Sequence, residues 1–231
     1  MSFTNVLKYG LLSQGGVLPF PSGCTAYYAF SAGAGTTITD SIASTNGTTN
    51  AGWSASGIRG NSILFANASE QSCTIANTAA ISFSSSFSIS LWVNPSTSQS
   101  QAERFIIHKQ LYPYNYRIDY PNDRFNFACA INGSWNAVTT TDTYAGDNWY
   151  HLVAIYDATA GKKLYVNGVL KASNSSTGSL MTGTVALTMG RYAGGNGYDY
   201  AGRLDEVGFW NRVLTTTEVA NLYNSGNGLY Y

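Results

Sequence analysis

The chain holds few of the side chains from which a catalytic site is built. A glycoside hydrolase needs two carboxylates on one face, one as acid and one as base or nucleophile. No glutamate has an aspartate two residues later, so a strand with two carboxylates at that spacing is absent. The only glutamates are Glu70, Glu103, Glu206 and Glu218.

Nucleophilic catalysis finds equally little support. A hydrolytic triad would need His108 or His151, and neither accompanies a Gly-x-Ser-x-Gly nucleophile motif. Both histidines lie inside strand patterns, and His151 is interpreted as a buried residue of a core strand beside Trp149 and Tyr150. The sequence therefore predicts no catalysis.

The charge balance excludes two classes of partner. Among 231 residues, 12 are Lys or Arg and 12 are Asp or Glu, which gives a formal net charge of 0. Nucleic acids and anionic membranes are bound through basic surfaces, so neither is expected as a partner. No run of eighteen apolar residues indicates a membrane span.

Residues 1–23 and the cysteines narrow the setting. Residues 1–23 show no sustained period and are predicted to form an arm or anchor, and their glycines interrupt any secretory signal. Cys24, Cys73 and Cys129 are odd in number and lack metal-type spacing, which argues against a disulfide framework and a zinc site. They are interpreted as small hydrophobic residues, with a Cys24–Cys73 bridge as the alternative.

From Cys24 onward the pattern has period two and predicts strands. Segments 87–93 and 125–131 alternate apolar with small or polar residues, which predicts two half-buried strands. Segment 148–157 is apolar on both faces, as expected for a central strand. Asn167-Gly168 between apolar runs predicts a tight hairpin of type I′. About a dozen strands follow, more than an immunoglobulin domain holds.

One helix is predicted near the end of the chain, over residues 216–225. Thr215 and Glu218 have the spacing of a capping box, and Leu214 and Val219 that of a hydrophobic staple. Val219, Leu222 and Tyr223 follow at helical spacing, and Gly226 is expected to end the helix. A helix this short is unstable alone, so its apolar stripe must dock on a sheet.

The order of these segments resembles the laminin-G-like, concanavalin-A-like jelly-roll domains. The segments that carry the resemblance are FSISLWVNP, DNWYHLVAIYD, KKLYVNGVLKA, VALTMGR and GRLDEVGFWNRVLTTTEVANLY. The resemblance covers roughly residues 24–229. It implies an all-β fold, a two-sheet antiparallel β-sandwich with one short C-terminal helix over 24–231. Glucanases of that fold carry a Glu-x-Asp-x-x-Glu strand, which this chain lacks.

The resemblance also implies a calcium site. In such domains a loop aspartate and the aspartate of the closing strand often meet around Ca²⁺, and here these are Asp40 and Asp205. Asn46 and Gly47 would add oxygens from the same loop, and hard oxygen ligands suit Ca²⁺. The alternative is that Asp40 caps a turn while Asp205 pairs with an arginine, Arg203 or Arg212.

Three segments rich in aromatic residues are the candidate ligand contacts. Segments 110–116, 131–136 and 190–200 combine Tyr and Trp with Asn, Asp and Gly, the residues with which lectins stack sugar faces and bind hydroxyls. The alternative is that these rings fold back over the edges of the sandwich. The candidate residues are Tyr112, Tyr114, Tyr116, Trp135, Tyr192, Asn196, Tyr198 and Asp199.

Three functions are compatible with these features. The first is a non-catalytic module of a bacteriophage virion, in the tail or as a capsid decoration protein, that binds surface glycans. Its arm, 1–23, would dock on a virion scaffold, a capsid or tail protein or a second copy of the chain. The second is a carbohydrate-binding or adhesion module of a secreted, extracellular bacterial protein. The third is a purely structural jelly roll without a ligand.

Overall fold

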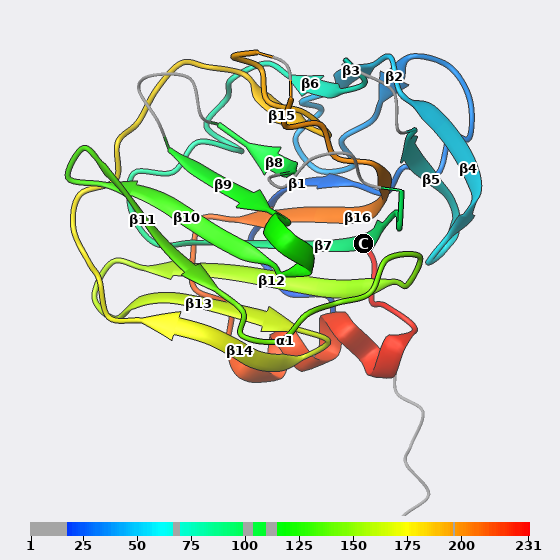
Figure 1. The fold of residues 1–231 in the computed structure, drawn as a ribbon. Helices are drawn as coiled ribbons and strands as arrows, with labels where there is room; N and C mark the ends of the chain where they lie inside the picture. The colour runs from blue at the N-terminus through cyan, green and yellow to red at the C-terminus, as the bar shows by residue number, and fades with distance from the viewer. Residues whose placement is uncertain (1–17, 67–69, 99–103, 110–114, 196) are drawn as a thin grey trace, which may run out of the picture.

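The protein folds into two antiparallel β-sheets packed face to face, with one short α-helix outside them (Figure 1). The computed structural model describes residues 18–66, 70–98, 104–109, 115–195 and 197–231. This architecture confirms the predicted sandwich and its C-terminal helix.

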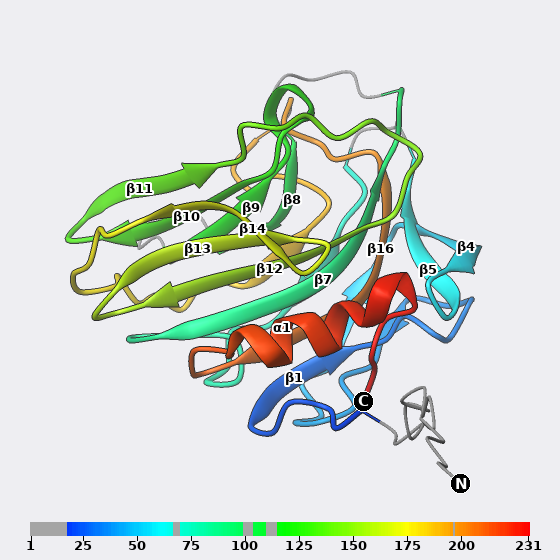
Figure 2. The same cartoon turned by 90° about the horizontal axis from the view of Figure 1, so that it is seen from below.

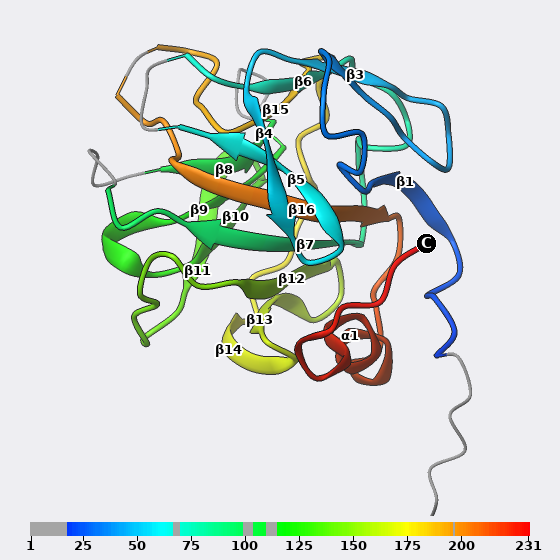
Figure 3. The ribbon, with the colours of Figure 1, turned by 90° about the vertical axis from the view of Figure 1, so that its right-hand side faces the viewer.

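Sheet A runs in the order β14-β13-β12-β7-β16-β5-β4, and β1 also pairs with β16. Figure 3 shows β4 and β5 extending this sheet beyond β16. Its strands are β1 (Cys24–Tyr28), β4 (Gly52–Gly57), β5 (Gly60–Phe65), β7 (Phe87–Pro95), β12 (Tyr150–Asp157), β13 (Gly161–Val166), β14 (Val169–Asn174) and β16 (Gly202–Trp210).

Sheet B runs in the order β11-β10-β9-β8-β15-β6-β3-β2. Its strands are β2 (Thr37–Ile38), β3 (Gly47–Thr49), β6 (Cys73–Ile75), β8 (Phe105–His108), β9 (Tyr116–Asp119), β10 (Asn126–Ile131), β11 (Ser134–Thr139) and β15 (Leu187–Met189). The helices are α1 (Thr216–Tyr223) and two 3₁₀ turns, η1 (Pro121–Asp123) and η2 (Asn224–Gly226).

Two local predictions are confirmed by the strand pairing. β12 lies between β7 and β13, so the doubly apolar segment is a central strand. β13 and β14 form the predicted hairpin, in which Asn167 and Gly168 have φ values of 51° and 78°. Positive φ at both turn residues is what a type I′ turn requires.

The main core lies between the sheets, but β7 and β10 are buried on both faces. The apolar set of β7 enters the core, whereas Ser88, Ser90 and Trp92 point to the outer face of sheet A and are at most 3% exposed. The prediction of half-buried strands is therefore wrong. For β7 the reason is that other parts of the chain cover this outer face.

Helix α1 covers part of that outer face, on the side of sheet A away from sheet B (Figure 2). Val219 and Leu222 pack with outward residues of β12, β13 and β16 in a second hydrophobic cluster. The ring of Tyr223 stacks 5.9 Å from that of Trp92. The predicted docking of the helix is confirmed.

The two ends of α1 differ in how well the sequence predicted them. The capping box is present: Glu218 N–H donates to the Thr215 hydroxyl, and Thr215 N–H donates to the Glu218 carboxylate. The helix ends at Tyr223, not at Ser225. Asn224, with φ 46°, takes the left-handed position expected of Gly226, because asparagine tolerates this conformation and comes first.

Residues 18–23, the described end of the predicted arm, lie against the domain itself. The Phe20 ring packs on Tyr27, Trp210 and Tyr231 at centroid distances of 5.3, 5.8 and 5.6 Å. The indole of Trp210 donates to the Pro21 carbonyl. The remainder of the arm lies outside the described residues.

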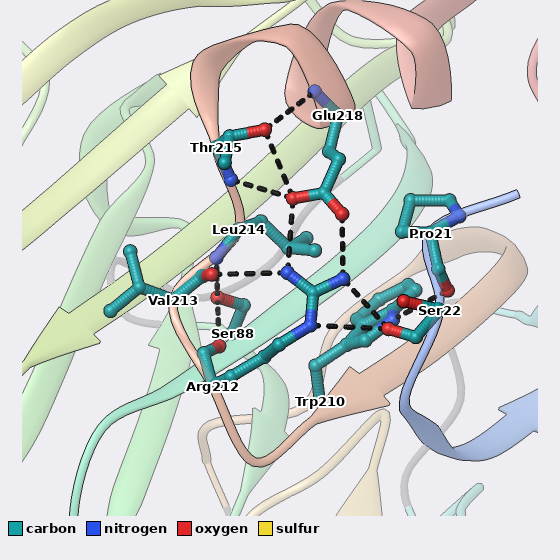
Figure 4. A network of polar contacts seen from close by, with 9 residues as sticks. All are labelled: Pro21, Ser22, Ser88, Trp210, Arg212, Val213, Leu214, Thr215 and Glu218. Carbon is teal, nitrogen blue, oxygen red and sulfur yellow. Dashed lines mark hydrogen bonds and ion pairs between the residues drawn. The ribbon is translucent and has the colours of Figure 1, made fainter. Parts of the chain in front are cut away.

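Arg212 ties this segment to the helix (Figure 4). Its guanidinium donates to the Ser22 carbonyl at 2.7 Å and to the Glu218 carboxylate at 2.6 Å. The hydroxyl of buried Ser88 donates to the Arg212 carbonyl and accepts from Leu214 N–H. A single network therefore joins the arm, β7 and the start of α1.

The cysteines behave as the main interpretation predicts. Cys73 and Cys129 are buried, Cys24 is half-buried, and all three are free, so the alternative Cys24–Cys73 bridge is absent. No helix in the described part of the chain is long and apolar enough to cross a membrane.

Candidate functional site

The outer face of sheet B carries a group of large side chains from several strands. Arg117 of β9 points outward because its neighbours Tyr116 and Ile118 enter the core. Phe105 and His108 of β8 both lie outside the core cluster, although they are three positions apart in the strand. A register shift between Phe105 and Ile107 allows this, since a regular strand would place them on opposite faces.

Phe105 is the centre of an aromatic cluster with His108, Tyr192 and Tyr198. The Tyr192 and Tyr198 rings lie 5.4 and 5.5 Å from Phe105 and 5.8 Å from each other. A side chain at Gly194 would collide with the Tyr192 ring, so the glycine leaves room for it. Tyr198 is 39% exposed, which leaves part of the cluster available to a ligand.

Arg117 connects this cluster to Trp135 of β11. Its guanidinium carbon lies 5.3 Å from the Phe105 ring and 5.1 Å from the Trp135 ring. Both distances are within the range of cation–π attraction. Three of the predicted ligand residues, Trp135, Tyr192 and Tyr198, are thereby brought onto one face.

His108 anchors the 190–193 turn to β8. Its Nε2 contacts the Arg191 carbonyl and accepts from Ala193 N–H at 3.2 Å. Burial lowers the pKa of His108 to about 4, and the charges of Arg117 and Arg191 add to that effect. His108 is therefore neutral at pH 7, and the positive charge here belongs to the arginines.

Polar side chains continue this face across β9, β10 and β11. Asn126 donates to the Asp119 carboxylate at 2.7 Å and accepts from the Thr139 hydroxyl at 2.8 Å. Thr139 is exposed, so the row ends in a hydroxyl open to solvent. Aromatic surface beside hydroxyl and amide groups is the combination that sugar recognition uses.

One predicted ligand residue is misplaced and three are undescribed. Tyr116 is 0% exposed, and its hydroxyl donates to the Ile81 carbonyl in the core. It belongs to β9 and not to the preceding loop, so a surface contact is wrong for it. Tyr112, Tyr114 and Asn196 lie outside the described residues.

Asp199 lies next to the aromatic cluster, bridged through its backbone to Phe105. Phe105, His108, Arg117 and Arg191 were missed as members of the face. Phe105, His108 and Arg117 sit within strand patterns, where local sequence gives no sign of a functional role. In sheet B, β8 pairs with β9, β9 with β10, and β10 with β11, and this pairing brings the residues together. The register between strands that are distant in the sequence cannot be read from any one segment.

The predicted calcium ligands have other partners. Both Asp40 oxygens accept backbone N–H groups, from Tyr27 and Ile42 on one and from Ala43 and Thr45 on the other. The Asn46 side-chain oxygen accepts Asp40 N–H. N–H donors aimed at an oxygen compete with a cation for it. Asp40 thus has the turn-capping arrangement of the alternative interpretation.

Asp205 is buried on the outer face of sheet A. Its Oδ2 accepts Ile58 N–H at 2.7 Å, and its Oδ1 accepts Glu206 N–H at 3.0 Å. The alternative interpretation expected Asp205 to pair with Arg203 or Arg212. Asp205 pairs with neither of them. Burial, followed by the charge of Glu206, raises its pKa to about 8.

The oxygens of Asp40, Asn46 and Asp205 are arranged as hydrogen-bond acceptors, and this arrangement suits them less well as calcium ligands. No group of three or more His, Cys, Asp or Glu residues that suits a metal occurs in the described part of the chain. The shared site of Asp40, Asn46, Gly47 and Asp205 stays a prediction. If it exists, a chelator will lower the Tm of the wild type and leave Asp205→Ala insensitive; an unchanged wild-type Tm excludes it.

Together, the two sheets and their strand orders define a lectin-type jelly roll. Residues 67–220 match the family model of the Concanavalin A-like lectin/glucanases superfamily. Because the match covers more than half of the chain, the chain belongs to that superfamily, as the resemblance predicted. No curated protein sequence matches it.

Solved structures of similar fold include three binding domains. The binding domain of Paraclostridial Mosquitocidal Protein 1 has a TM-score of 0.71 and 17% identity, over 88% of this chain and 52% of that one. The Botulinum Neurotoxin serotype G binding domain has a TM-score of 0.69 and 16% identity, over 87% of this chain and 50% of that one. This chain therefore spans about half the length of both.

The match to the third structure covers nearly the whole of that solved chain. Domain 4 of AbnA, a GH43 extracellular arabinanase from Geobacillus stearothermophilus, was solved in complex with arabinotriose. It has a TM-score of 0.68 and 20% identity, over 85% of this chain and 96% of that one. At this level of identity the likeness concerns the fold.

Proposed function

We propose that the protein is a non-catalytic glycan-binding module that uses the outer face of sheet B. The observation that carries the proposal is the convergence of Trp135, Tyr192 and Tyr198 around Phe105 and Arg117. These rings come from segments up to 63 residues apart, the span from 135 to 198. The arabinotriose complex of the similar arabinanase domain is consistent with this ligand class.

The absence of catalysis is part of the proposal. His108 and His151 are each about 1% exposed, and burial lowers the pKa of His151 to about 3. His151 contacts the Ser90 hydroxyl at 2.8 Å, but its Nδ1 has no hydrogen-bond partner in the described part of the chain. A base needs access to substrate and a group that orients it, and this histidine has neither.

A glycan array with single-residue variants tests the binding role. Trp135→Ala and Tyr198→Ala are each expected to weaken binding by about two- to tenfold, since one stacking contact is worth about 0.5–1.5 kcal/mol. The matched control is Tyr230→Ala, which removes a tyrosine of similar exposure, 38%, beside α1. Equal binding by all variants, or no binding of any glycan, would refute the proposal.

The setting we propose is a bacteriophage virion, in which the N-terminal segment attaches the module to a capsid or tail protein. Support comes from the position of residues 18–22 on the outer face of sheet A, opposite the aromatic face. Attachment there would leave the glycan face outward. Cosedimentation with particles, lost when residues 2–17 are deleted from a still folded chain, would support it; unchanged cosedimentation would contradict it.

A further inference from the structure

A hollow of about 270 Å³ lies beside the aromatic cluster, between β6, β15 and the 190–193 turn. Thr74 and Thr188 are direct cross-strand neighbours on its floor, and Thr188 in turn is paired with His108. The hollow and the aromatic cluster thus share the outer face of sheet B. Its lining residues are Ser72, Thr74, Ala186, Thr188, Arg191 and Ala193.

Arg191 lines this hollow and brings a guanidinium to it. Its Nε is buried and has no hydrogen bond in the described part of the chain. The ion pair with Asp199 has an Nε to Oδ1 distance of 3.9 Å, which is beyond hydrogen-bond range. The aspartate therefore lies close enough to attract the guanidinium without accepting a hydrogen bond from Nε.

Arg191 is the one charged side chain among the described residues that line the hollow. A guanidinium only donates, whereas the hydroxyls of Ser72, Thr74 and Thr188 both donate and accept. Two alanines, Ala186 and Ala193, leave space without adding polar groups. A planar, oxygen-rich anion matches such a site, because arginine binds carboxylates with two parallel hydrogen bonds.

We infer that this hollow binds the carboxylate of an acidic sugar residue, with Arg191 as its charged partner and Thr74 and Thr188 as hydroxyl partners. The glycan recognised by the module is then anionic, with its sugar faces on the aromatic cluster and a carboxylate beside β15. This inference rests on the proposed function and specifies its ligand class.

The test compares uronic-acid polysaccharides, namely alginate, polygalacturonate and hyaluronate, with the same polymers after carboxyl reduction. Reduction keeps the backbone and removes the charge, so only the predicted contact changes. The wild type is expected to bind at least one native polymer about tenfold more tightly than its reduced form. Raising the salt concentration should weaken only the native complex.

Variants assign that preference to the hollow. Arg191→Gln should abolish the preference for the native polymer, and Arg191→Lys should keep part of it, since lysine retains the charge without the planar fork. Arg124→Gln, which removes an exposed arginine outside the hollow, should behave as wild type. Thermal melts of each variant confirm that the fold is intact.

The outcomes separate this inference from the function on which it rests. Equal binding of native and reduced polymers, with both weakened by Trp135→Ala, overturns the anionic subsite and leaves glycan binding in place. A preference that survives in Arg191→Gln also overturns it. If the protein binds dextran sulfate but no carboxylate polymer, the inference of a carboxylate ligand is wrong, and the hollow binds a sulfate group instead. No binding of any glycan refutes both proposals.

Discussion

The outer face of sheet A is covered by α1, by residues 18–22 and by the last residues of the chain, whereas no α-helix of the described residues lies over the outer face of sheet B (Figures 1 and 2). Both faces are rich in aromatic rings. On sheet A, Trp210 is 0% exposed beneath its cover, while on sheet B Tyr198 is 39% exposed.

This difference teaches that aromatic content does not by itself identify a binding surface. Tyr223 stacks on both Trp92 and His151, whose own rings are tilted to each other, and these contacts hold the helix in place on sheet A. The aromatic cluster on sheet B anchors only a turn, 190–193, and part of the surface of the cluster remains exposed to solvent. The predictions below test whether one face serves stability and the other serves binding.

The largest expected effect on stability belongs to the covered face. Leu222→Ala removes a side chain that is 2% exposed and packs in the second hydrophobic cluster. The free energy of unfolding should fall by about 2–4 kcal/mol, measured by denaturant titration. Leu170→Ala, at an exposed hairpin position, is the control. A loss as small as the control's would show that the helix is not docked as described.

A smaller effect is expected from the buried carboxylate under this cover. Because the pKa of Asp205 is raised to about 8 in the folded state, its contribution is present below the unfolded pKa near 4 and is lost as pH rises through 8. The wild type should lose about 2 kcal/mol of stability between pH 6 and pH 9. Asp205→Asn should flatten this dependence; an unchanged pH profile would contradict the assignment.

The start of the helix gives the opposite pH dependence. Hydrogen bonds from Arg212 lower the pKa of Glu218 to about 2, so the stability it provides is present above the unfolded pKa near 4.5 and is lost as pH falls toward 2. Glu218→Gln should cost about 1 kcal/mol at pH 7 and little at pH 2. Thermal melts at both pH values measure this, and an equal cost at both would argue against the ion pair.

The smallest effect on stability should come from the open face. Tyr198→Ala should lower the free energy of unfolding by less than about 1 kcal/mol, because the ring is partly exposed and makes T-shaped contacts with Phe105 and Tyr192. The same variant is expected to weaken glycan binding by about two- to tenfold. A large loss of stability would make this face structural like the other, and the contrast between the two would disappear.

The sequence predicts the fold well because its signals are local. Asn167-Gly168 demands a hairpin, and Thr215 with Glu218 demands the start of a helix, whatever surrounds them. The burial of Ser88 and Ser90 could not be predicted in this way. Their partners, Arg212 and His151, lie more than 60 residues away in the chain, so an alternating pattern looked half-exposed.

The residues of the candidate site also divide into those with a local sequence signal and those without one. Trp135, Tyr192 and Tyr198 were identified because aromatic residues among Asn and Gly stand out in loops. Tyr116 looked similar, but the strand β9 begins at this residue and turns its ring inward. Arg117, one residue later, connects the site and has no local signal. The register between β9, β10 and β11 aligns Arg117 with Ala137, two residues from Trp135, within reach of the indole ring.

The contact between Phe20 and Tyr231 also determines how this domain can be combined with others. Their rings lie 5.6 Å apart, so the first and last described segments of the chain lie side by side, next to β1 (Figure 3). A unit with adjacent ends can be inserted into a surface loop of a host protein without separating the host's own flanking segments. A fusion or insertion made at Phe20 and Tyr231 therefore lies on the outer face of sheet A and leaves the outer face of sheet B clear.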